Sequence, residues 1–295
     1  MKKEIERINE SIKEDKPKDN SKYESKTAKV FGVSIRRVFG YMVIYSFLGY
    51  LVEVVYGIIT KGVIECRQSF LYGPFSCIYG LGAIAMILPL KKIKTSNKLI
   101  QFLILGLIGC TVEYCVSLYG DLVQHVKWWD YSDYFLNING RTCLYYGIFW
   151  GVLGLLLIYV INPRVDNLIS RHSKRVTRKN QNRFVAIANI ILLLDLIVSS
   201  FAADFYQTRV IYEKDIDVPL KDYYVQRYHK IYDNEIRKKF IESIWGNEVM
   251  IQTFPNHRIK NNSGDIIFLK DYYPEIKSYY FKVFETEKSK VQDWF

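Results

Sequence analysis

Five long apolar segments dominate the middle of this 295-residue chain and restrict what it can fold into. They span residues 38–59, 71–90, 99–122, 142–161 and 184–204. About 20 mainly apolar residues are enough for one helix to cross a bilayer. A soluble core buries one or two such segments, but five in succession are hard to shield from water. We therefore predict an all-α polytopic membrane protein with about five transmembrane helices over residues 38–204.

The N-terminal end of the chain is polar. Residues 1–37 are rich in Lys, Glu, Asp, Asn and Ser, which predicts a disordered arm. The first thirty or so residues lack the apolar stretch of a cleavable signal peptide. The segment 38–59 is therefore expected to act as its own signal anchor.

The C-terminal tail, residues 205–295, mixes charged and aromatic side chains. Apolar residues recur in it at helical spacing, which predicts an amphipathic helix: Tyr224, Tyr228, Ile231, Tyr232, Ile236, Phe240 and Ile244. This helix either packs in a small folded unit or lies on the membrane surface. Gly264-Asp265 followed by residues 266–269 predicts a turn and a strand. The tail is thus expected to be α-rich, with an α+β fold as the alternative.

The formal net charge of +11 is concentrated at the ends of the spans, which argues against a nucleic-acid partner. Two connections carry most of it: Lys91, Lys92, Lys94 and Lys98 in one, and Arg164, Arg171, Lys174, Arg175, Arg178, Lys179 and Arg183 in the other. Basic connections stay in the cytoplasm. The prediction is therefore a cytoplasmic N-terminus and, with five spans, a C-terminal tail outside; the alternative is a cytoplasmic tail if the fifth span does not cross.

Three carboxylates lie inside predicted spans: Glu53, Glu113 and Asp195. Each acidic group costs about 2.5–3.5 kcal/mol near the centre of a span, so it should face the protein interior or a wet cavity. In this topology Glu53 and Glu113 lie in the outer half at similar depth. They are predicted to share an outward-facing polar site, whereas the role of Asp195 is left open.

Two further features are predicted beside that site. Gly73-Pro74 would break the second span near its outer end, because proline removes a backbone donor. The loop HVKWWDYSDYFLNINGR, residues 125–141, joins the third and fourth spans. Trp128 and Trp129 are typical of a membrane interface. The loop is interpreted as a lid over the polar site.

No cofactor or metal site is predicted. The cysteines Cys66, Cys77, Cys110, Cys115 and Cys143 lie in or beside the spans without metal-ligand spacing. His125 is the one histidine near the polar site, and no nucleophile–base pair accompanies it. An enzyme is therefore the weaker hypothesis, acting on a lipid or envelope precursor at the outer leaflet. A non-catalytic sensor or scaffold is the third.

Four sequence blocks resemble the bacterial membrane family of type IV ABC transporter permeases (CmpB-like). They are YSFLGY at 45–50 with Glu53; FLYGP at 70–74 leading to Ile78-Tyr79-Gly80; Glu113-Tyr114 with WWDYS at 128–132, Asn137 and Gly140-Arg141; and Trp150-Gly151. The blocks cover roughly residues 40–161. The chain departs from the family pattern at Cys77, where a proline is usual, and at Asp121, where a glutamate is usual.

The resemblance implies a transport component in a bacterial plasma membrane. Candidate substrate-binding residues are Glu53, Tyr79, Glu113, Trp129, Asp130, Asn137 and Arg141. Candidate structural residues are Gly73, Pro74, Gly80, Trp128, Gly140 and Trp150. The chain has no nucleotide-binding motif, so a permease of this kind would need a separate ATPase. Residues 162–183 would be its docking surface, or else a basic loop bound to anionic lipid. Self-association into a homo-oligomer is a further expectation.

Overall fold

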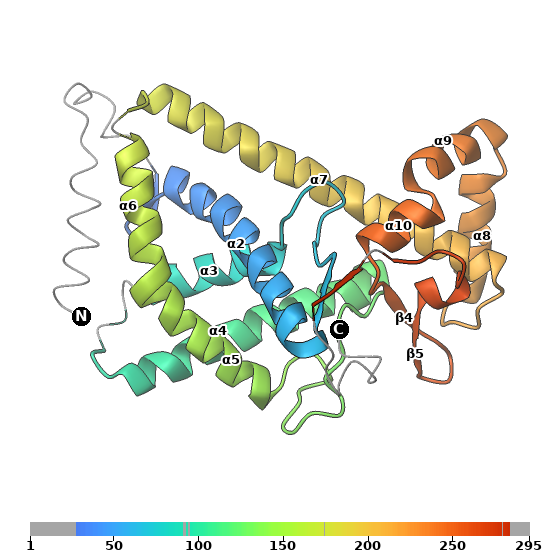
Figure 1. Cartoon of the computed structure of the whole chain (residues 1–295), viewed down its shortest axis with the longest axis horizontal. Helices are drawn as coiled ribbons and strands as arrows, with labels where there is room; N and C mark the ends of the chain where they lie inside the picture. The colour runs from blue at the N-terminus through green and yellow to red at the C-terminus, as the bar shows by residue number, and fades with distance from the viewer. Residues whose placement is uncertain (1–27, 91–92, 94, 174, 279, 284–295) are drawn as a thin grey trace. The chain divides into compact units, whose positions relative to one another are not determined.

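The computed structural model describes residues 28–90, 93, 95–173, 175–278 and 280–283 (Figure 1). Its helices are α2 (Ile35–Lys61), α3 (Cys77–Leu90), α4 (Lys98–Tyr119), α5 (Leu144–Leu156), α6 (Asn162–Ser173), α7 (Arg178–Glu213), α8 (Lys221–Tyr232), α9 (Glu235–Trp245) and α10 (Asn247–Thr253). The short strands form two-stranded antiparallel pairs: β1 (Lys29–Val30) with β2 (Val33–Ser34), β3 (Val63–Glu65) with β6 (Tyr280–Lys282), and β4 (Arg258–Lys260) with β5 (Ile266–Phe268).

Four helical stretches in the described part of the chain are long and apolar enough to cross a membrane. They are Ile35–Lys61, Lys98–Gln124, Leu144–Arg171 and Arg178–Glu213. The second includes a π-helical turn after α4, and the third joins α5 to α6 through another. Large apolar side chains along them, such as Leu51, Val55 and Ile59, are exposed, as expected of lipid-facing positions. The predicted all-α polytopic membrane fold is confirmed.

The predicted span 71–90 is shorter as a helix than the sequence suggested. α3 begins only at Cys77 and has 14 residues. At 1.5 Å per residue it is about 21 Å long, less than the roughly 30 Å of a hydrocarbon core. Residues 71–76 are non-helical, and Gly73 has φ of +109°. The predicted break at Gly73-Pro74 is therefore present, and it delays the helix by one further turn.

The last part of the predicted N-terminal arm, residues 28–37, contains regular secondary structure. The first part of the arm, residues 1–27, lies outside the described residues. Residues 29–34 form the β1–β2 hairpin, and α2 begins at Ile35 rather than Val38. Both residues of that turn have positive φ, +49° at Phe31 and +80° at Gly32, a conformation that glycine adopts without strain.

The chain divides into two compact units. Unit 1 comprises residues 1–46, 77–114 and 131–192, and unit 2 comprises residues 47–76, 115–130 and 193–295. The dividing points fall inside α2, α4 and α7, so each of these helices contributes residues to both units.

Unit 1 is built on close helix packing. A Cβ atom on Gly106 of α4 would lie 2.7 Å from the carbonyl oxygen of Gly147 on α5, so only glycine permits this approach. Gly80 of α3 lies equally close to Ser46 of α2. Small residues therefore allow the helices of unit 1 to approach closely, as is usual in membranes where helices gain little from hydrophobic burial.

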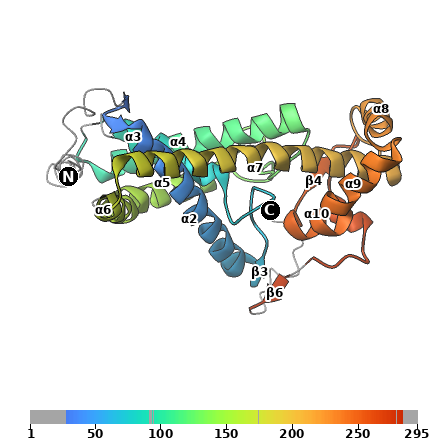
Figure 2. The same ribbon diagram turned by 90° about the horizontal axis from the view of Figure 1, so that it is seen from above.

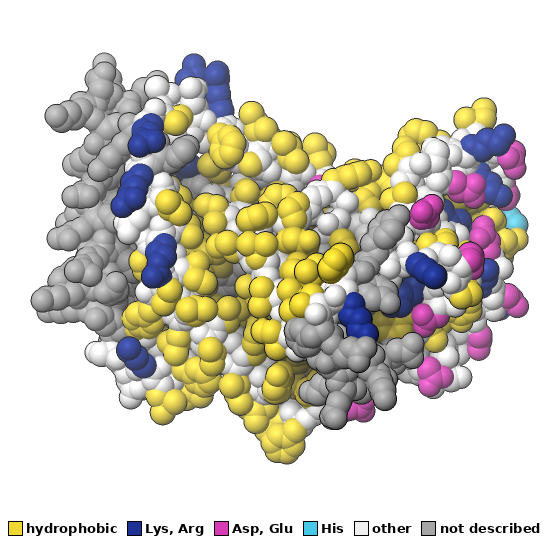
Figure 3. All heavy atoms as spheres, in the orientation of Figure 1, with side chains coloured by type: hydrophobic (Ala, Val, Ile, Leu, Met, Phe, Trp, Pro, Cys, Tyr) yellow, Lys and Arg dark blue, Asp and Glu magenta, His cyan; other side chains and the backbone are white. Residues whose placement is uncertain are grey.

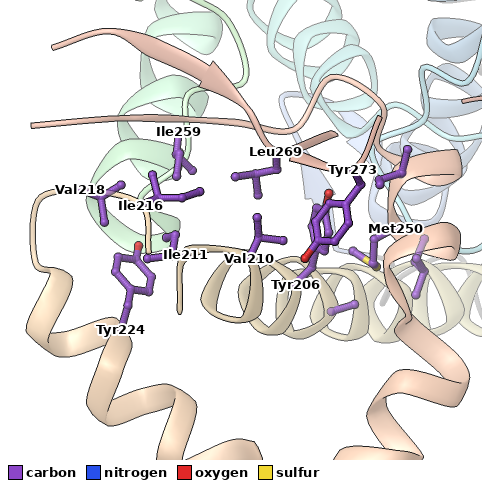
Figure 4. Packing of buried hydrophobic residues seen from close by; sticks show 13 residues of the cluster. Tyr206, Val210, Ile211, Ile216, Val218, Tyr224, Met250, Ile259, Leu269 and Tyr273 are labelled. Carbon is purple, nitrogen blue, oxygen red and sulfur yellow. The ribbon is translucent and has the colours of Figure 1, made fainter. Parts of the chain in front are cut away.

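Unit 2 contains a hydrophobic core contributed largely by α7 and the tail (Figure 4). The tail was expected to begin at residue 205, but α7 continues to Glu213 without a break. Tyr206, Val210 and Ile211 face this core, whereas Phe201 one turn earlier is exposed. One helix therefore changes from a lipid-exposed to a core-packed element. Figure 2 shows β6 beside β3, the pair that joins the end of the tail to the segment after α2.

The predicted amphipathic helix of the tail is two helices. Asn234 ends the pattern, because its side chain accepts a hydrogen bond from the Arg237 backbone N–H and caps α9. α8 buries Tyr224, Ile231 and Tyr232, as core packing requires. The predicted strand is confirmed as β5, which pairs with β4 across the Gly264 turn.

Candidate functional site

Glu113, the intramembrane carboxylate of unit 1 that was predicted from the sequence, is buried, with 3% of its surface exposed. Its Oε1 atom accepts a hydrogen bond from the Tyr131 hydroxyl at 3.0 Å. Its Oε2 atom accepts one from the Thr142 hydroxyl at 2.8 Å. A carboxylate removed from water is tolerated only when such donors satisfy it. Glu113 of α4 is thus held by the two ends of the segment that leads into α5.

The segment 131–142 folds so that both hydroxyls reach Glu113. The Tyr131 N–H donates to the Gly140 carbonyl at 2.8 Å, and an isolated bridge pairs Ile138 with Thr142. Gly140 has φ of +66°, which favours glycine in this turn. The Tyr131 ring stacks on Tyr146 of α5 with centroids 4.3 Å apart. These contacts hold Tyr131 and Thr142 beside Glu113.

Two predicted site residues in this segment, Asn137 and Arg141, interact with neighbouring residues of unit 1. The Asn137 amide donates to the carbonyls of Ser132 and Tyr134, and its oxygen accepts from the Gly140 N–H. The Arg141 guanidinium lies over the Tyr114 ring, 5.6 Å from its centroid. Asn137 therefore shapes the loop, and its role as a ligand stays a prediction.

Tyr79 of α3 packs against Trp150, whose indole N–H is a second buried polar group of unit 1. Its ring lies 5.4 Å from that of Trp150, which packs on Gly109 of α4. The Trp150 indole N–H is buried and has no hydrogen-bond partner among the described residues. The buried hydroxyl of Ser46, close to Gly80, also lacks one in the part of the chain that is described. Trp150 and Ser46 thus each place a buried donor in unit 1 without an acceptor among the described residues.

A buried polar network in unit 1 was not predicted. Asp166 of α6 accepts a hydrogen bond from the Tyr41 hydroxyl at 2.6 Å, and Arg37 lies 3.6 Å from the same oxygen. Asn162 accepts from Tyr45 at 2.8 Å. The sequence placed Asp166 in a basic connection, but α6 continues from the preceding span. The signal for this network was the spacing of Arg37, Tyr41 and Tyr45 on one helix face.

Glu53, in unit 2, is paired with an arginine that the sequence did not single out. Arg67 donates to Glu53 at 3.3 Å and to Glu65 at 2.7 Å. Its guanidinium lies against Gly57, where a Cβ atom would be 2.6 Å from Nε. A glycine one turn after an intramembrane glutamate was the available signal. Glu53 therefore has a counter-charge of its own.

Glu65 belongs to the same charged cluster, beyond the end of the span. Burial alone would raise the pKa of Glu65, but the charges of Lys61 and Arg67 together lower it below its ordinary value. The Lys61 ammonium lies 3.1 Å from Glu65, and the Asn256 amide also donates to it. The cluster thus connects the end of α2 to the tail within unit 2.

Asp195 of α7 accepts a backbone hydrogen bond from the non-helical segment before α3, also within unit 2. Its Oδ1 atom accepts the Tyr72 backbone N–H at 3.1 Å and the Ser199 hydroxyl at 3.0 Å. The Ser199 oxygen accepts the Leu71 N–H at 2.6 Å. Backbone donors freed by a helix break at membrane depth need such partners. Asp195, left without a role by the sequence, is an architectural acceptor.

The first part of the 125–141 loop, residues 125–130, is held by the tail in unit 2. The buried Arg258 guanidinium donates to the carbonyls of Lys127 and Trp128, each at 2.9 Å. Trp128 packs against Gly120 and lies 6.2 Å from Trp129. Asp130 lies 4.0 Å from Lys127. Arg258 was not foreseen, because nothing in the tail sequence marks its partners as two backbone carbonyls.

The seven predicted substrate-binding residues fall into both units. Tyr79, Glu113, Asn137 and Arg141 belong to unit 1, and Glu53, Trp129 and Asp130 belong to unit 2. A site shared by Glu53 and Glu113 stays a prediction. In the described residues, no group of three or more His, Cys, Asp or Glu side chains is arranged to bind a metal ion.

The apolar helices and buried intramembrane polar groups define a multi-pass membrane protein. The chain matches the model of the family described as "Putative ABC-transporter type IV" over residues 40–200, and it belongs to that family. The match includes most of each span, the whole 125–141 loop, and Asp195. Comparisons with curated proteins and with solved structures gave no match.

Proposed function

We propose that this protein is the membrane component of an ABC-type transporter and that unit 1 binds a small polar substrate beside Glu113. The observation that carries the proposal is the set of buried polar groups in unit 1. Glu113 supplies a carboxylate, while Trp150 Nε1 and Ser46 Oγ are donors without acceptors in the described part of the chain. A membrane protein that leaves such donors unpaired forfeits about 1–3 kcal/mol for each.

The way in which Glu113 is held supports exchange with a ligand. Its donors are the hydroxyls of Tyr131 and Thr142, and hydroxyls can rotate towards another acceptor. Tyr131 comes from a loop, and loops positioned by a rigid scaffold often carry binding residues. A substrate with its own hydrogen-bond donor could replace Tyr131 at Glu113, and its acceptors could engage Trp150.

A screen of small polar compounds tests this site. The full-length protein, purified in mild detergent, would be screened against amino acids, sugars, nucleosides and vitamins by thermal unfolding. A ligand at 100 times its Kd stabilises the folded state by about 2.7 kcal/mol. The Glu113→Gln and Trp150→Phe variants should lose the stabilisation by the hit, whereas Asn261→Ala in the β4–β5 turn should keep it. Hits that stabilise the wild type and all three variants equally would contradict the proposal.

We propose α6 as the surface that binds a separate ATPase. One face of the helix is buried by Val165 and Asp166, while Arg164, Leu168 and Arg171 are not. Leu168, at 64% exposure between two arginines, suits an apolar contact with an acidic rim. Replacement of Leu168 by Glu should abolish co-purification of an ATPase from the native membrane, whereas Asn167→Asp should not. Retention of the ATPase by both variants would argue for the alternative, a basic surface that meets anionic lipid.

The orientation follows from the positive-inside rule and forms part of the same proposal. We propose a bacterial plasma-membrane location with the N-terminus in the cytoplasm and the tail outside. A cysteine introduced at Asp133, in a variant without the five native cysteines, should react with an impermeant maleimide added to intact cells. Reaction only after the cells are opened would reverse the proposed orientation.

A further inference from the structure

Helix α9 exposes an apolar face that the core of the tail does not use. Ile236 is 82% exposed and Phe240, one turn later, is 61% exposed. The opposite face is buried, where Ile241 and Trp245 pack with Phe205, Tyr228 and Tyr232. An amphipathic helix normally buries its apolar stripe once, so a second apolar face needs its own partner. Figure 3 shows hydrophobic side chains at the surface in the region of α9.

The attachment of α9 to α7 places this face near the end of a membrane span. Trp245 contacts Phe205 of α7 with ring centroids 5.9 Å apart, and its indole N–H donates to the Tyr72 hydroxyl at 3.3 Å. Exposed apolar side chains on α7 stop at Phe201, and residues 206–211 are buried. Phe205 therefore lies where the lipid-facing part of α7 gives way to the tail. Tryptophan and tyrosine are the residues that favour this level of a membrane.

The charges beside the apolar face also suit a lipid surface. Arg237 and Lys239 lie between Ile236 and Phe240 in the sequence, and the helical spacing places them on the two sides of the apolar face, where both are exposed. One guanidinium nitrogen of Arg237 donates to the Lys230 carbonyl. Interfacial helices combine such basic flanks with an apolar face that enters the boundary between headgroups and acyl chains. The helix from Ile236 to Trp245 is about 14 Å long at 1.5 Å per residue, so the whole face is within reach of the same boundary.

We infer that α9 is an interfacial helix that inserts Ile236 and Phe240 into the bilayer surface, with Arg237 and Lys239 on lipid phosphates. The bilayer is its partner because the transmembrane part of the same chain fixes α9 at that level, which keeps its effective concentration at the surface high. This inference concerns the tail alone and does not depend on the transport proposal.

Lipid quenching of a fluorescent amino acid tests the inference in the full-length protein. The probe would replace Ser243, which shares the exposed face of α9, in nanodiscs of ordinary or brominated phosphatidylcholine and phosphatidylglycerol. Brominated chains should reduce its emission. The same probe at Ser263, in the exposed β4–β5 turn, should keep its emission in both lipids.

Two variants separate the contributions of the apolar and basic side chains. Ile236→Ser with Phe240→Ser should abolish the quenching at 243, and Arg237→Gln with Lys239→Gln should remove only its dependence on phosphatidylglycerol. Both leave Ile241 and Trp245 in place, and an unchanged thermal unfolding curve in detergent would show that the tail remains folded. Equal emission at 243 in both lipids would overturn the inference. A probe at 243 that is protected from the bromine atoms only in nanodiscs with two copies of the protein would also overturn the inference, in favour of a contact between copies.

Discussion

Glu113 and Asp195 are both buried carboxylates inside spans, yet they accept hydrogen bonds from different kinds of donor. Glu113, 3% exposed, accepts from the side-chain hydroxyls of Tyr131 and Thr142. Asp195, 7% exposed, accepts a backbone N–H from Tyr72 and a hydroxyl from Ser199, which itself accepts the Leu71 N–H. Burial alone therefore does not distinguish the carboxylate proposed to bind a ligand from the structural one.

The kind of donor makes that distinction. A backbone N–H in a broken helix has no alternative partner in the bilayer, so its acceptor cannot leave without a large cost. A hydroxyl can turn to another acceptor, and its loss leaves no fixed donor unpaired. Asp195 is thus tied to the architecture of the 71–76 segment, whereas the hydroxyls that donate to Glu113 can turn to another acceptor, as the proposed binding role requires.

Replacement of Asp195 by Leu should have the largest effect. It leaves the Tyr72 N–H unpaired within the protein at membrane depth, and we expect a loss of about 3 kcal/mol in the free energy of unfolding. Asp195→Asn keeps an acceptor oxygen at the same place and should lose about 1 kcal/mol or less. Unfolding of the full-length protein in detergent micelles would measure both. Equal losses for Leu and Asn would refute the assignment of Asp195 to the backbone.

A comparison of the two carboxylates by pH must also account for the titration of His257, a half-buried group outside the spans. Its ring lies 3.1 Å from the Gln207 side-chain oxygen, and burial lowers its pKa to about 4 from 6.5. The unfolded chain binds this proton more readily between those values, so stability is complete above pH 6.5 and falls as the pH drops towards 4. We expect a loss of about 2–3 kcal/mol from this residue.

The His257→Gln variant isolates that contribution. The difference in unfolding free energy between the wild type and the variant should shrink as the pH falls from about 7 to about 4. Should the difference remain constant, His257 would not be the group that titrates. The variant also supplies the background in which acid effects on Asp195 and Glu113 can be compared directly.

The sequence predicted those parts of this arrangement that depend on local pattern. The apolar runs located the spans, Gly73-Pro74 marked the helix break, and the spacing of Asp195 and Ser199 is that of neighbours on one helix face, where they form a hydrogen bond. These features follow from composition and helical spacing along a single segment. They do not depend on which segment lies next to which.

The features that the sequence did not predict depend on contacts between segments far apart in the chain. The Tyr72 N–H meets Asp195 across 123 positions, and no pattern in either segment names the other. In the sequence Arg67 is a loop charge that balances Glu65, because its reach back to Glu53 depends on the turn after α2. The residues of α6 resemble a loop because basic side chains mask the buried face formed by Val165 and Asp166. In this protein the sequence therefore predicts the partners of individual side chains less well than it predicts spans or helix breaks.

The third prediction concerns the hydroxyls on Glu113. Tyr131→Phe should cost about 1–2 kcal/mol of unfolding free energy, because it removes one hydrogen bond to a charged group. In a Glu113→Gln background the same change should cost much less, since the neutral acceptor gains little from the hydroxyl. A double-mutant cycle in detergent measures the difference. Additive losses would mean that the Tyr131 hydroxyl contributes independently of Glu113, because phenylalanine keeps the ring that stacks on Tyr146.

The smallest expected effect concerns Glu53, the carboxylate that has an arginine partner. Gly57→Ala would place a Cβ atom 2.6 Å from the Arg67 Nε and push the guanidinium away from Glu53. A partly exposed ion pair contributes little, so the net loss should be about 1 kcal/mol. Gly40→Ala in the same helix is the matched control, because a Cβ atom there meets nothing within 4 Å. That control should be neutral or should stabilise the protein by about 0.5–1 kcal/mol, because alanine favours helix more than glycine does. If both variants behave alike, the contact between Gly57 and Arg67 does not hold the pair, and Glu53 would then resemble Glu113 in depending on movable donors.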